Sequence, residues 1–176
     1  MNFKIIGRKT VYEGRAFSVE KVQAGLPDGH EREYDLVNHA GSVTILPLDA
    51  DGRIWFVRQY RLGAQDVLLE LPAGVLDAEE TPEEGAAREV REETGLAAGK
   101  LERLGGFYLA PGYSSEFMTV FLATELRSDP LSADADEFLQ AEAIPVAEAF
   151  QLVKEGKIQD GKTLATLMLA RDHLGL

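Results

Sequence analysis

The sequence predicts an α/β (α+β) fold, with a mixed β-sheet sandwiched between helices and an N-terminal β-strand extension. Short apolar segments of strand type, separated by turn residues, fill the first part of the chain. One segment with clear helix-start and helix-stop residues lies near the middle, and apolar residues at helical spacing occupy the end. A chain of 176 residues that is 45% apolar has the size of a single compact domain.

The early strands are predicted where β-branched and aromatic residues lie between turn signals. They run from Thr10 to Tyr12, Phe17 to Val22, Arg32 to Val37, Ser42 to Leu48, Arg53 to Tyr60 and Leu68 to Leu71. Asp51-Gly52 predicts a hairpin between the fourth and fifth of these segments. We expect residues 1–40 to form the strand extension and residues 41–176 to form the main domain.

The second half contains both element types. Strands are predicted from Leu101 to Leu109 and from Phe117 to Ala123, with a Pro111-Gly112 loop between them. Helices are predicted from Val146 to Glu155 and from Thr163 to His173.

The composition excludes several classes of protein. A net charge of −12 disfavours binding to nucleic acid backbones and anionic membranes, although a small anion bridged by metal ions stays possible. The chain has no cysteine, no signal-peptide pattern and no apolar run of membrane-spanning length, so we expect a cytoplasmic location. The three histidines, His30, His39 and His173, share no metal-ligand spacing.

The central segment has the pattern of a capped helix. Thr81 fits an N-cap, Pro82 the first helical position and Glu84 the capping-box partner. Gly95 can adopt the left-handed conformation that ends a helix. The helix is therefore expected from about Pro82 to Thr94.

Three glutamates of this helix, Glu89, Glu92 and Glu93, are spaced at i, i+3 and i+4 and project from one face. Two such charges about 4 Å apart repel by roughly 4 kcal/mol at an effective dielectric of about 20. A hard divalent cation such as Mg²⁺ or Mn²⁺ would relieve this repulsion, with Arg88 pairing to Glu92 and leaving the other carboxylates free for metal. The alternative is that the three glutamates are an ordinary solvated helix face.

The surrounding residues resemble a known family. The segment GVLDAEETPEEGAAREVREETGL, from Gly74 to Leu96, is similar to the Nudix box, Gly-x5-Glu-x7-Arg-Glu-U-x-Glu-Glu-x-Gly-U with U apolar. Every defined position agrees, namely Gly74, Glu80, Arg88, Glu89, Val90, Glu92, Glu93, Gly95 and Leu96. The resemblance implies the Nudix fold, in which this loop, helix and loop hold divalent metals against a diphosphate.

The resemblance also implies metal ligands. Glu89 and Glu93 would be the principal ligands, Glu92 a third ligand or a close neighbour, and Ala73 a ligand through its carbonyl. The expected ion is Mg²⁺, with Mn²⁺ or another divalent cation as alternatives.

Other box residues have supporting roles in the family. Arg88 would orient a carboxylate at the catalytic site, and Glu80 would be a structural acid beside it. Gly74 and Gly95 would have a conformational role, because each flanks a turn in which a residue with a side chain would be unfavourable.

Residues outside the box are similar to the ADP-ribose pyrophosphatase group of the family. Pro111 lies 16 residues beyond Gly95, as in that group, and the Pro111-Gly112 loop would contact the substrate. The group places a glutamate on this loop to activate water, which makes Glu116 the first choice of general base and Glu92 the second. Arg61 would bind the diphosphate or the terminal ribose, and Arg58 is a further candidate, with a solubilising strand-edge arginine as the alternative.

The predicted reaction is the hydrolysis of a nucleoside diphosphate derivative, ADP-ribose, to AMP and ribose 5-phosphate. Two alternatives stay open: a Nudix hydrolase for another sugar nucleotide or a dinucleotide such as NADH or FAD, and a Nudix module that binds a nucleotide without cleaving it. The resemblance further implies a homodimer formed through the N-terminal strands.

Overall fold

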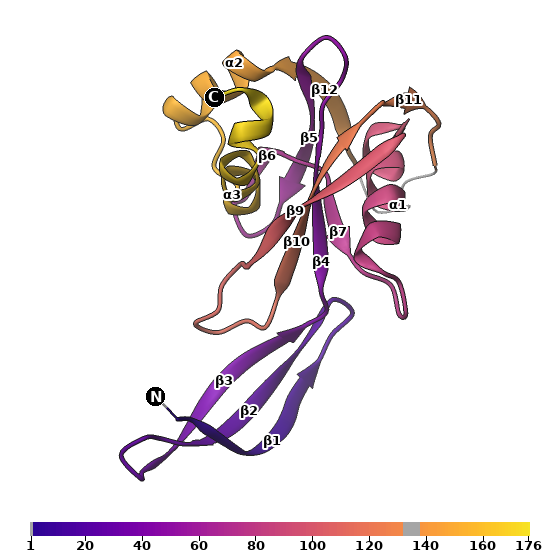
Figure 1. The fold of residues 1–176 in the computed structure, drawn as a ribbon. Coiled ribbons are helices and arrows are strands. Elements are labelled where there is room, and N and C mark those ends of the chain that lie inside the picture. Colours follow the sequence, from indigo (N-terminus) through magenta and orange to yellow (C-terminus); the bar gives the residue numbers. More distant parts are fainter. Residues whose placement is uncertain (1, 132–137) are drawn as a thin grey trace. The chain divides into compact units, whose positions relative to one another are not determined.

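The computed structural model describes residues 2–131 and 138–176, and the chain forms two compact units (Figure 1). The first unit comprises Met1–Gly41 and Tyr108–Phe117, and the second comprises Ser42–Phe107 and Met118–Leu176. The sequence did not indicate that the segment from Tyr108 to Phe117 belongs with the N-terminal strands.

The first unit is built on an antiparallel three-stranded sheet in the order β1-β2-β3. Its strands are β1 (Lys4–Glu13), β2 (Phe17–Gly25) and β3 (Glu31–His39). Strand β1 begins well before the predicted Thr10, because β2 provides a partner along its whole length. The second segment is held to β3 by backbone hydrogen bonds from Val37 to Tyr113 (2.7 Å) and from Ser115 to Val37 (3.0 Å).

The second unit contains the remaining sheets and all the helices that the structure describes. One sheet has the order β7-β4-β10-β9, a second has the order β12-β5-β6, and a short one pairs β11 with β8. Strands β4 and β10 are parallel, whereas β4 pairs antiparallel with β7, so the sheet is mixed as predicted. The strands are β4 (Ser42–Pro47), β5 (Arg53–Arg61), β6 (Asp66–Glu70), β7 (Ala73–Val75), β8 (Leu96–Ala97), β9 (Lys100–Tyr108), β10 (Phe117–Thr124), β11 (Arg127–Ser128) and β12 (Gln140–Pro145).

Helices cover this unit on two sides (Figure 1). Helix α1 (Pro82–Thr94) lies on one side of the sheets, and α2 (Val146–Lys154) and α3 (Gly161–Leu169) lie on the other. Within the described residues, no helix is long and apolar enough to cross a membrane.

The last predicted helix has different bounds in the structure. Helix α3 begins two residues before Thr163, because the Asp160 side chain caps it by accepting a hydrogen bond from the Thr163 amide at 2.9 Å. It ends at Leu169 and not at His173, and Arg171–Leu174 forms a tighter 3₁₀ turn closed by Gly175 at φ 72°. The predicted continuous helix was therefore wrong over its last turn.

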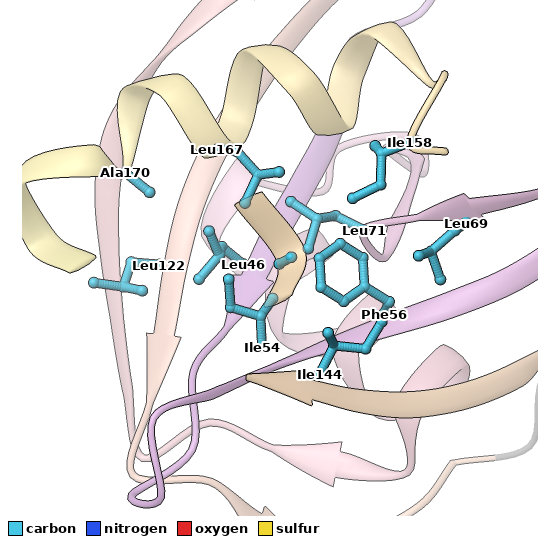
Figure 2. Packing of buried hydrophobic residues seen from close by; sticks show 11 residues of the cluster. Leu46, Ile54, Phe56, Leu69, Leu71, Leu122, Ile144, Ile158, Leu167 and Ala170 are labelled. Atoms are coloured by element: carbon cyan, nitrogen blue, oxygen red, sulfur yellow. The ribbon is translucent and has the colours of Figure 1, made fainter. Parts of the chain in front are cut away.

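Strand β4 separates two apolar cores, and all six of its residues are buried. Val43 and Ile45 pack with Ala86 and Val90 of α1. Leu46 belongs to a larger cluster with residues of β5, β6, β10, β12, α2 and α3, among them Phe56 and Leu167 (Figure 2). The apolar side chains of this buried strand come from Val43, Ile45 and Leu46, and the polar Ser42 and Thr44 are buried with them.

Candidate active site

Helix α1 has the ends that the sequence predicts. The Thr81 hydroxyl accepts a hydrogen bond from the Glu84 amide (3.3 Å), and the Glu84 carboxylate accepts one from the Thr81 amide (2.9 Å). Gly95 is left-handed at φ 73°, and its amide donates to the Arg91 carbonyl at 3.0 Å. The predicted range from Pro82 to Thr94 is confirmed, and the buried side of α1 packs on β4.

Gly74 leaves space for a glutamate of this helix. It lies in β7, paired with Val43 of β4, and the Glu89 carboxylate occupies the place where a side chain would begin. A Cβ atom added to Gly74 would lie 1.9 Å from Glu89 Oε1, far inside contact distance. Glu89 is only 7% exposed, so its carboxylate lies in a close-fitting place between the helix and β7.

Arg88 is surrounded by acidic side chains. Its Nε and Nη2 donate to the two oxygens of Glu80 at 2.9 and 2.8 Å. Its Nη1 donates to Glu89 at 2.6 Å and to Glu92 at 2.9 Å, and Nη2 also reaches the Val75 carbonyl at 3.2 Å. The Glu80 hydrogen bonds are the main cause that raises the pKa of Arg88, and the Arg88 guanidinium in turn lowers the pKa of Glu80.

This arrangement differs in one respect from the sequence prediction. Arg88 pairs with Glu92 as expected. It does not leave the other carboxylates free for metal, however, since it also binds Glu80 and Glu89. The physical reason is that a guanidinium carries five N–H donors and can serve several carboxylates at once, which helical spacing alone does not reveal.

Glu93 connects α1 to the strand segment before Gly74. Its Oε2 accepts a hydrogen bond from the Ala73 amide at 3.0 Å, and the residue is 6% exposed. The neighbouring Pro72 carbonyl accepts from the Ile45 amide at 2.9 Å. The segment that carries Ala73 and Gly74 is therefore fixed to both α1 and β4.

Arg61 lies at the end of β5 and binds a buried carboxylate. Its Nε and Nη2 donate to Glu70 Oε1 (2.9 Å) and Oε2 (2.7 Å). Glu70 is 1% exposed, and its Oε2 also accepts from Lys162 of α3, which pairs in turn with Asp160 at 3.0 Å. Burial opposes ionisation of Glu70, but hydrogen bonds and charge from Arg61 and Lys162 outweigh it and lower the pKa of this carboxyl.

Sequence reasoning missed Glu70 and Lys162, which are 92 positions apart. One signal was available: Glu70 is the only charged residue in the predicted strand from Leu68 to Leu71, and a buried strand tolerates a carboxylate only with a partner. The identity of that partner was not available from the sequence.

The sequence matches the NUDIX domain family over residues 38–167, a range that contains the whole candidate site of the second unit. This chain belongs to the NUDIX domain family. The Nudix fold and the assignment to an enzyme family of Nudix pyrophosphatases are thereby confirmed.

Relatives of this Nudix chain carry related names. It is 34% identical over 162 residues to the ADP-ribose pyrophosphatase of Bacillus subtilis (strain 168), with 91% of this chain and 88% of the relative covered. It is 36% identical over 170 residues to the ADP-ribose pyrophosphatase of Mycobacterium tuberculosis (strain ATCC 25618 / H37Rv), with 95% and 82% covered. A solved structure described as an ADP compounds hydrolase has a TM-score of 0.88 at 28% identity and covers 99% of this chain and 95% of that one.

The Nudix box residues fit a divalent cation by their chemistry. Glu89, Glu92 and Glu93 offer the carboxylate oxygens that hard cations prefer, and Gly74 leaves Glu89 a place that a Cβ would fill. In the described part of the chain, no group of three or more acidic or histidine side chains is arranged so that it could hold a metal ion, and the Arg88 guanidinium contacts both Glu89 and Glu92. Glu80 binds Arg88 through two separate hydrogen bonds, so Arg88 has an anchor that does not depend on Glu89 or Glu92.

Arg58 and Arg61 are separated by the strand that carries them. They are three positions apart in β5 and therefore point to opposite faces of the sheet. Arg58 is exposed and pairs with Glu142 of β12 at 2.7 Å. The structure thus brings Arg61, but not Arg58, into contact with Glu70.

The remaining predicted residues belong to the first unit. Gly112 contributes to a largely apolar cavity of about 270 Å³ with Ile5, Tyr34 and Leu36 among its lining residues. Pro111 is exposed in the same loop. Glu116 is half-buried, its amide donates to the Ser114 hydroxyl at 3.2 Å, and its carbonyl accepts from the Leu109 amide at 3.2 Å.

Proposed function

We propose that this Nudix protein hydrolyses the diphosphate of ADP-ribose to AMP and ribose 5-phosphate in a reaction that depends on Mg²⁺ or a similar divalent cation. The observation that carries the proposal is the buried pair of glutamates on α1, with Glu89 seated over Gly74 and Glu93 fixed by the Ala73 amide. Buried acids held in this way are suited to bind a cation that neutralises a diphosphate. The two relatives named ADP-ribose pyrophosphatases support the choice of substrate.

Each box residue has a role in the proposal. Glu89, Glu92, Glu93 and the Ala73 carbonyl would hold the metal. When bound, it would supply neutralisation of diphosphate charge and a lowered pKa of a bound water. Glu80 holds Arg88 beside the acids through two hydrogen bonds, and Arg88 would keep a positive charge at the edge of the site with a metal bound.

The remaining roles concern the substrate and the proton. Arg61 binds the diphosphate, since about two-fifths of its side chain is exposed at the end of β5. Glu116 accepts the proton of the attacking water, with Glu92 as the second candidate. The Pro111-Gly112 loop contributes a further substrate contact, and no substrate role is proposed for Arg58, which pairs with Glu142 on the opposite face of β5 from Arg61.

The experiment is a product analysis. The purified protein is incubated with ADP-ribose and Mg²⁺, with EDTA in a parallel sample, and with NADH, FAD and other sugar nucleotides in the rest of a panel. AMP and ribose 5-phosphate, formed only with metal and fastest from ADP-ribose, are the expected result. Cleavage of no panel member would favour a nucleotide-binding module without catalysis.

A second candidate substrate is another ADP compound or a dinucleotide such as NADH or FAD. The observation in its favour is the solved Nudix structure whose description names ADP compounds without restriction to ADP-ribose. If such a compound is cleaved faster than ADP-ribose, the proposed roles of the α1 residues stand and the proposed substrate is wrong.

The metal assignment predicts the behaviour of Glu93→Gln. This substitution keeps the shape of the side chain and removes a charge that binds the cation, so we expect turnover to fall by at least about a hundredfold. The matched control is Glu83→Gln, an exposed glutamate in the first turn of the same helix, which should retain turnover. Normal Mg²⁺-dependent turnover of Glu93→Gln would refute the assignment.

We also propose a homodimer formed through the first unit. All ten residues of β1 are exposed, and five large apolar side chains in and next to this strand are about half-exposed: Phe3, Ile5, Ile6, Val11 and Tyr12. Strand β1 is the edge of its sheet. An apolar surface along a strand edge is typical of a region that pairs with another chain.

A further inference from the structure

The Glu70 carboxylate is the most deeply buried acid in the described residues, and the proposed reaction assigns no task to it. It receives two hydrogen bonds from Arg61 and one from Lys162. Lys162 is itself only 7% exposed, which is rare for a lysine unless it is paired. Burying an ion costs several kcal/mol. Charged side chains that only make a protein soluble lie on its surface, so the buried Glu70 and Lys162 must have another role.

We propose that Lys162 and Glu70 are positioning residues for Arg61, and that they fix its guanidinium in the orientation that binds the substrate diphosphate. The inference rests on the proposed function in one respect, the role of Arg61 in binding a diphosphate. It adds two residues and one element, helix α3, to the machinery of that site.

The geometry gives the first argument. Both Glu70 oxygens are used by Arg61 in a fork-to-fork pair, which fixes the plane of the guanidinium as well as its position. The third nitrogen, Nη1, lies outside this pair, and 39% of the Arg61 side chain is exposed. The pair therefore holds one edge of the guanidinium against the protein and leaves another edge for a ligand.

The role of Lys162 follows from charge. Glu70 alone could neutralise Arg61, and an arginine whose charge is fully matched is a weaker binder of anions. Lys162 supplies a second positive charge at the same carboxylate oxygen, and Asp160 lies 3.0 Å from its ammonium. Asp160 offsets the charge of Lys162, so the four groups carry no net charge. The effect of Lys162 is local, because Glu70 Oε2 is shared between two cations instead of serving Arg61 alone.

The third argument is the place of this cluster in the unit. The hydrogen bonds and the charge of Glu70 raise the pKa of Arg61 most strongly. The negative charge of Glu93 raises it further, so Arg61 also interacts with an acid of the Nudix box. The chain directly after Glu70 is held by α3 as well, since the Leu71 amide donates to the Thr163 hydroxyl at 2.8 Å. Two residues further on, the Ala73 amide binds Glu93. Helix α3 thus supports both Arg61 and the segment that reaches the box acids.

The test is a double-mutant cycle between Lys162→Met and Arg61→Ala. The readout is the calorimetric affinity for the α,β-methylene analogue of ADP in the presence of Mg²⁺, a diphosphate probe that is not hydrolysed at the bridge. We expect Lys162→Met to weaken binding about tenfold when Arg61 is present and less than about twofold when Arg61 is alanine. An equal loss in both backgrounds, or no loss in either, would overturn the proposal.

Two further variants separate positioning from general effects. Lys157→Met removes a lysine that pairs with Glu155 at 2.8 Å and is 64% exposed, and it should leave the affinity unchanged. If Lys162→Met does not fold, the double substitution Glu70→Gln with Lys162→Met removes the uncompensated buried charge. That variant should show the same dependence on Arg61, and additivity would count against the inference.

The probe also keeps this inference distinct from the proposed substrate. Methylene-ADP contains the nucleoside diphosphate without the second ribose, so its binding does not require that ADP-ribose be cleaved. Binding that depends on Arg61 and Lys162 in a protein that prefers another substrate would uphold the positioning role and reject only the substrate. A native protein that does not bind the probe would reject the positioning role.

Discussion

At the scale of single residues, the absent side chain of Gly74 determines where the Glu89 carboxylate lies. The space that a Cβ would take is filled by both oxygens and the carboxyl carbon of Glu89, at 1.9 to 2.5 Å from the ideal Cβ position. Gly74 is not in the left-handed region, so the requirement is one of space and not of backbone conformation. The glycine at the first defined position of the Nudix box thus has a steric reason in this chain.

This contact predicts the effect of Gly74→Ala. The added methyl group must push the Glu89 carboxylate aside, and a displacement of about 1 Å in a catalytic group can cost about a hundredfold in rate. The carboxylate is the far end of a flexible side chain, so we expect turnover to fall while the thermal unfolding midpoint changes little. Gly63→Ala, where no atom lies within 4 Å of the new Cβ, is the matched control and should leave turnover near that of the native protein.

Glu70 gives a prediction for acid stability. Its pKa in the folded protein is below the ordinary value of 4.5, so the ionised carboxylate stabilises the folded state. That contribution is complete above pH 4.5 and is lost as the pH falls through the lower folded-state pKa. The native protein should therefore exceed Glu70→Gln in free energy of unfolding by about 3 kcal/mol near neutral pH, and by progressively less below pH 4.5.

Denaturant unfolding at several pH values measures this difference. A gap between the two proteins that stays constant from pH 7 to the acid limit would show that the charge of Glu70 is not the stabilising feature.

The sequence predicted the residues of the box better than their partners. Glu89, Glu92 and Glu93 could be placed on one face from helical periodicity, since those contacts are local. The Glu70–Lys162 pair could not be predicted, because the two residues meet only after β6 and α3 have packed. Pairing preferences between distant charged residues leave no periodic signal in one sequence.

At the scale of elements, predictability follows the number of independent local signals. Helix α1 has a capping box, a proline at its start and a left-handed glycine at its end, and its bounds were predicted correctly. Strand β12 has no such signals: it alternates alanine with polar residues from Gln140 to Ala143 and forms because β5 offers it a complete antiparallel partner. Strands β7, β8 and β11 are too short to show periodicity.

The packing of α3 is the element-scale contact that the positioning role requires. Leu167 is 2% exposed and lies in the cluster with Phe56 and Leu71 (Figure 2), whereas its neighbour Met168 is 66% exposed. Leu167→Ala should lower the free energy of unfolding by about 2 to 5 kcal/mol, because it leaves a cavity in this cluster. Met168→Ala on the same helix should change it by less than about 0.5 kcal/mol. Equal effects of the two substitutions in denaturant unfolding would mean that α3 does not pack as described.

At the scale of the whole molecule, the charge is distributed unevenly. Between Asp77 and Glu93 eight acids and two arginines account for half of the net charge of −12. Part of this excess is offset locally by Arg88 among the box acids, and the acid Glu70 outside the segment is matched in the same way by Arg61 and Lys162. The first unit differs in kind, because its β1 strand presents apolar side chains to solvent.

That exposed strand leads to a prediction about assembly. If β1 forms the dimer contact, native protein should have a mass of about twice 19.3 kDa in sedimentation equilibrium. Ile5→Lys with Val11→Lys places two charges on the strand, and charges on an edge strand oppose pairing with another chain. The double variant should therefore sediment as a 19.3 kDa monomer. Lys9→Gln, in the same strand, removes a charge without burying one and should remain dimeric. A monomeric native protein would show that there is no dimer, and a double variant that stays dimeric would show that the dimer contact lies outside β1. In either case the apolar side chains of β1 would need another partner.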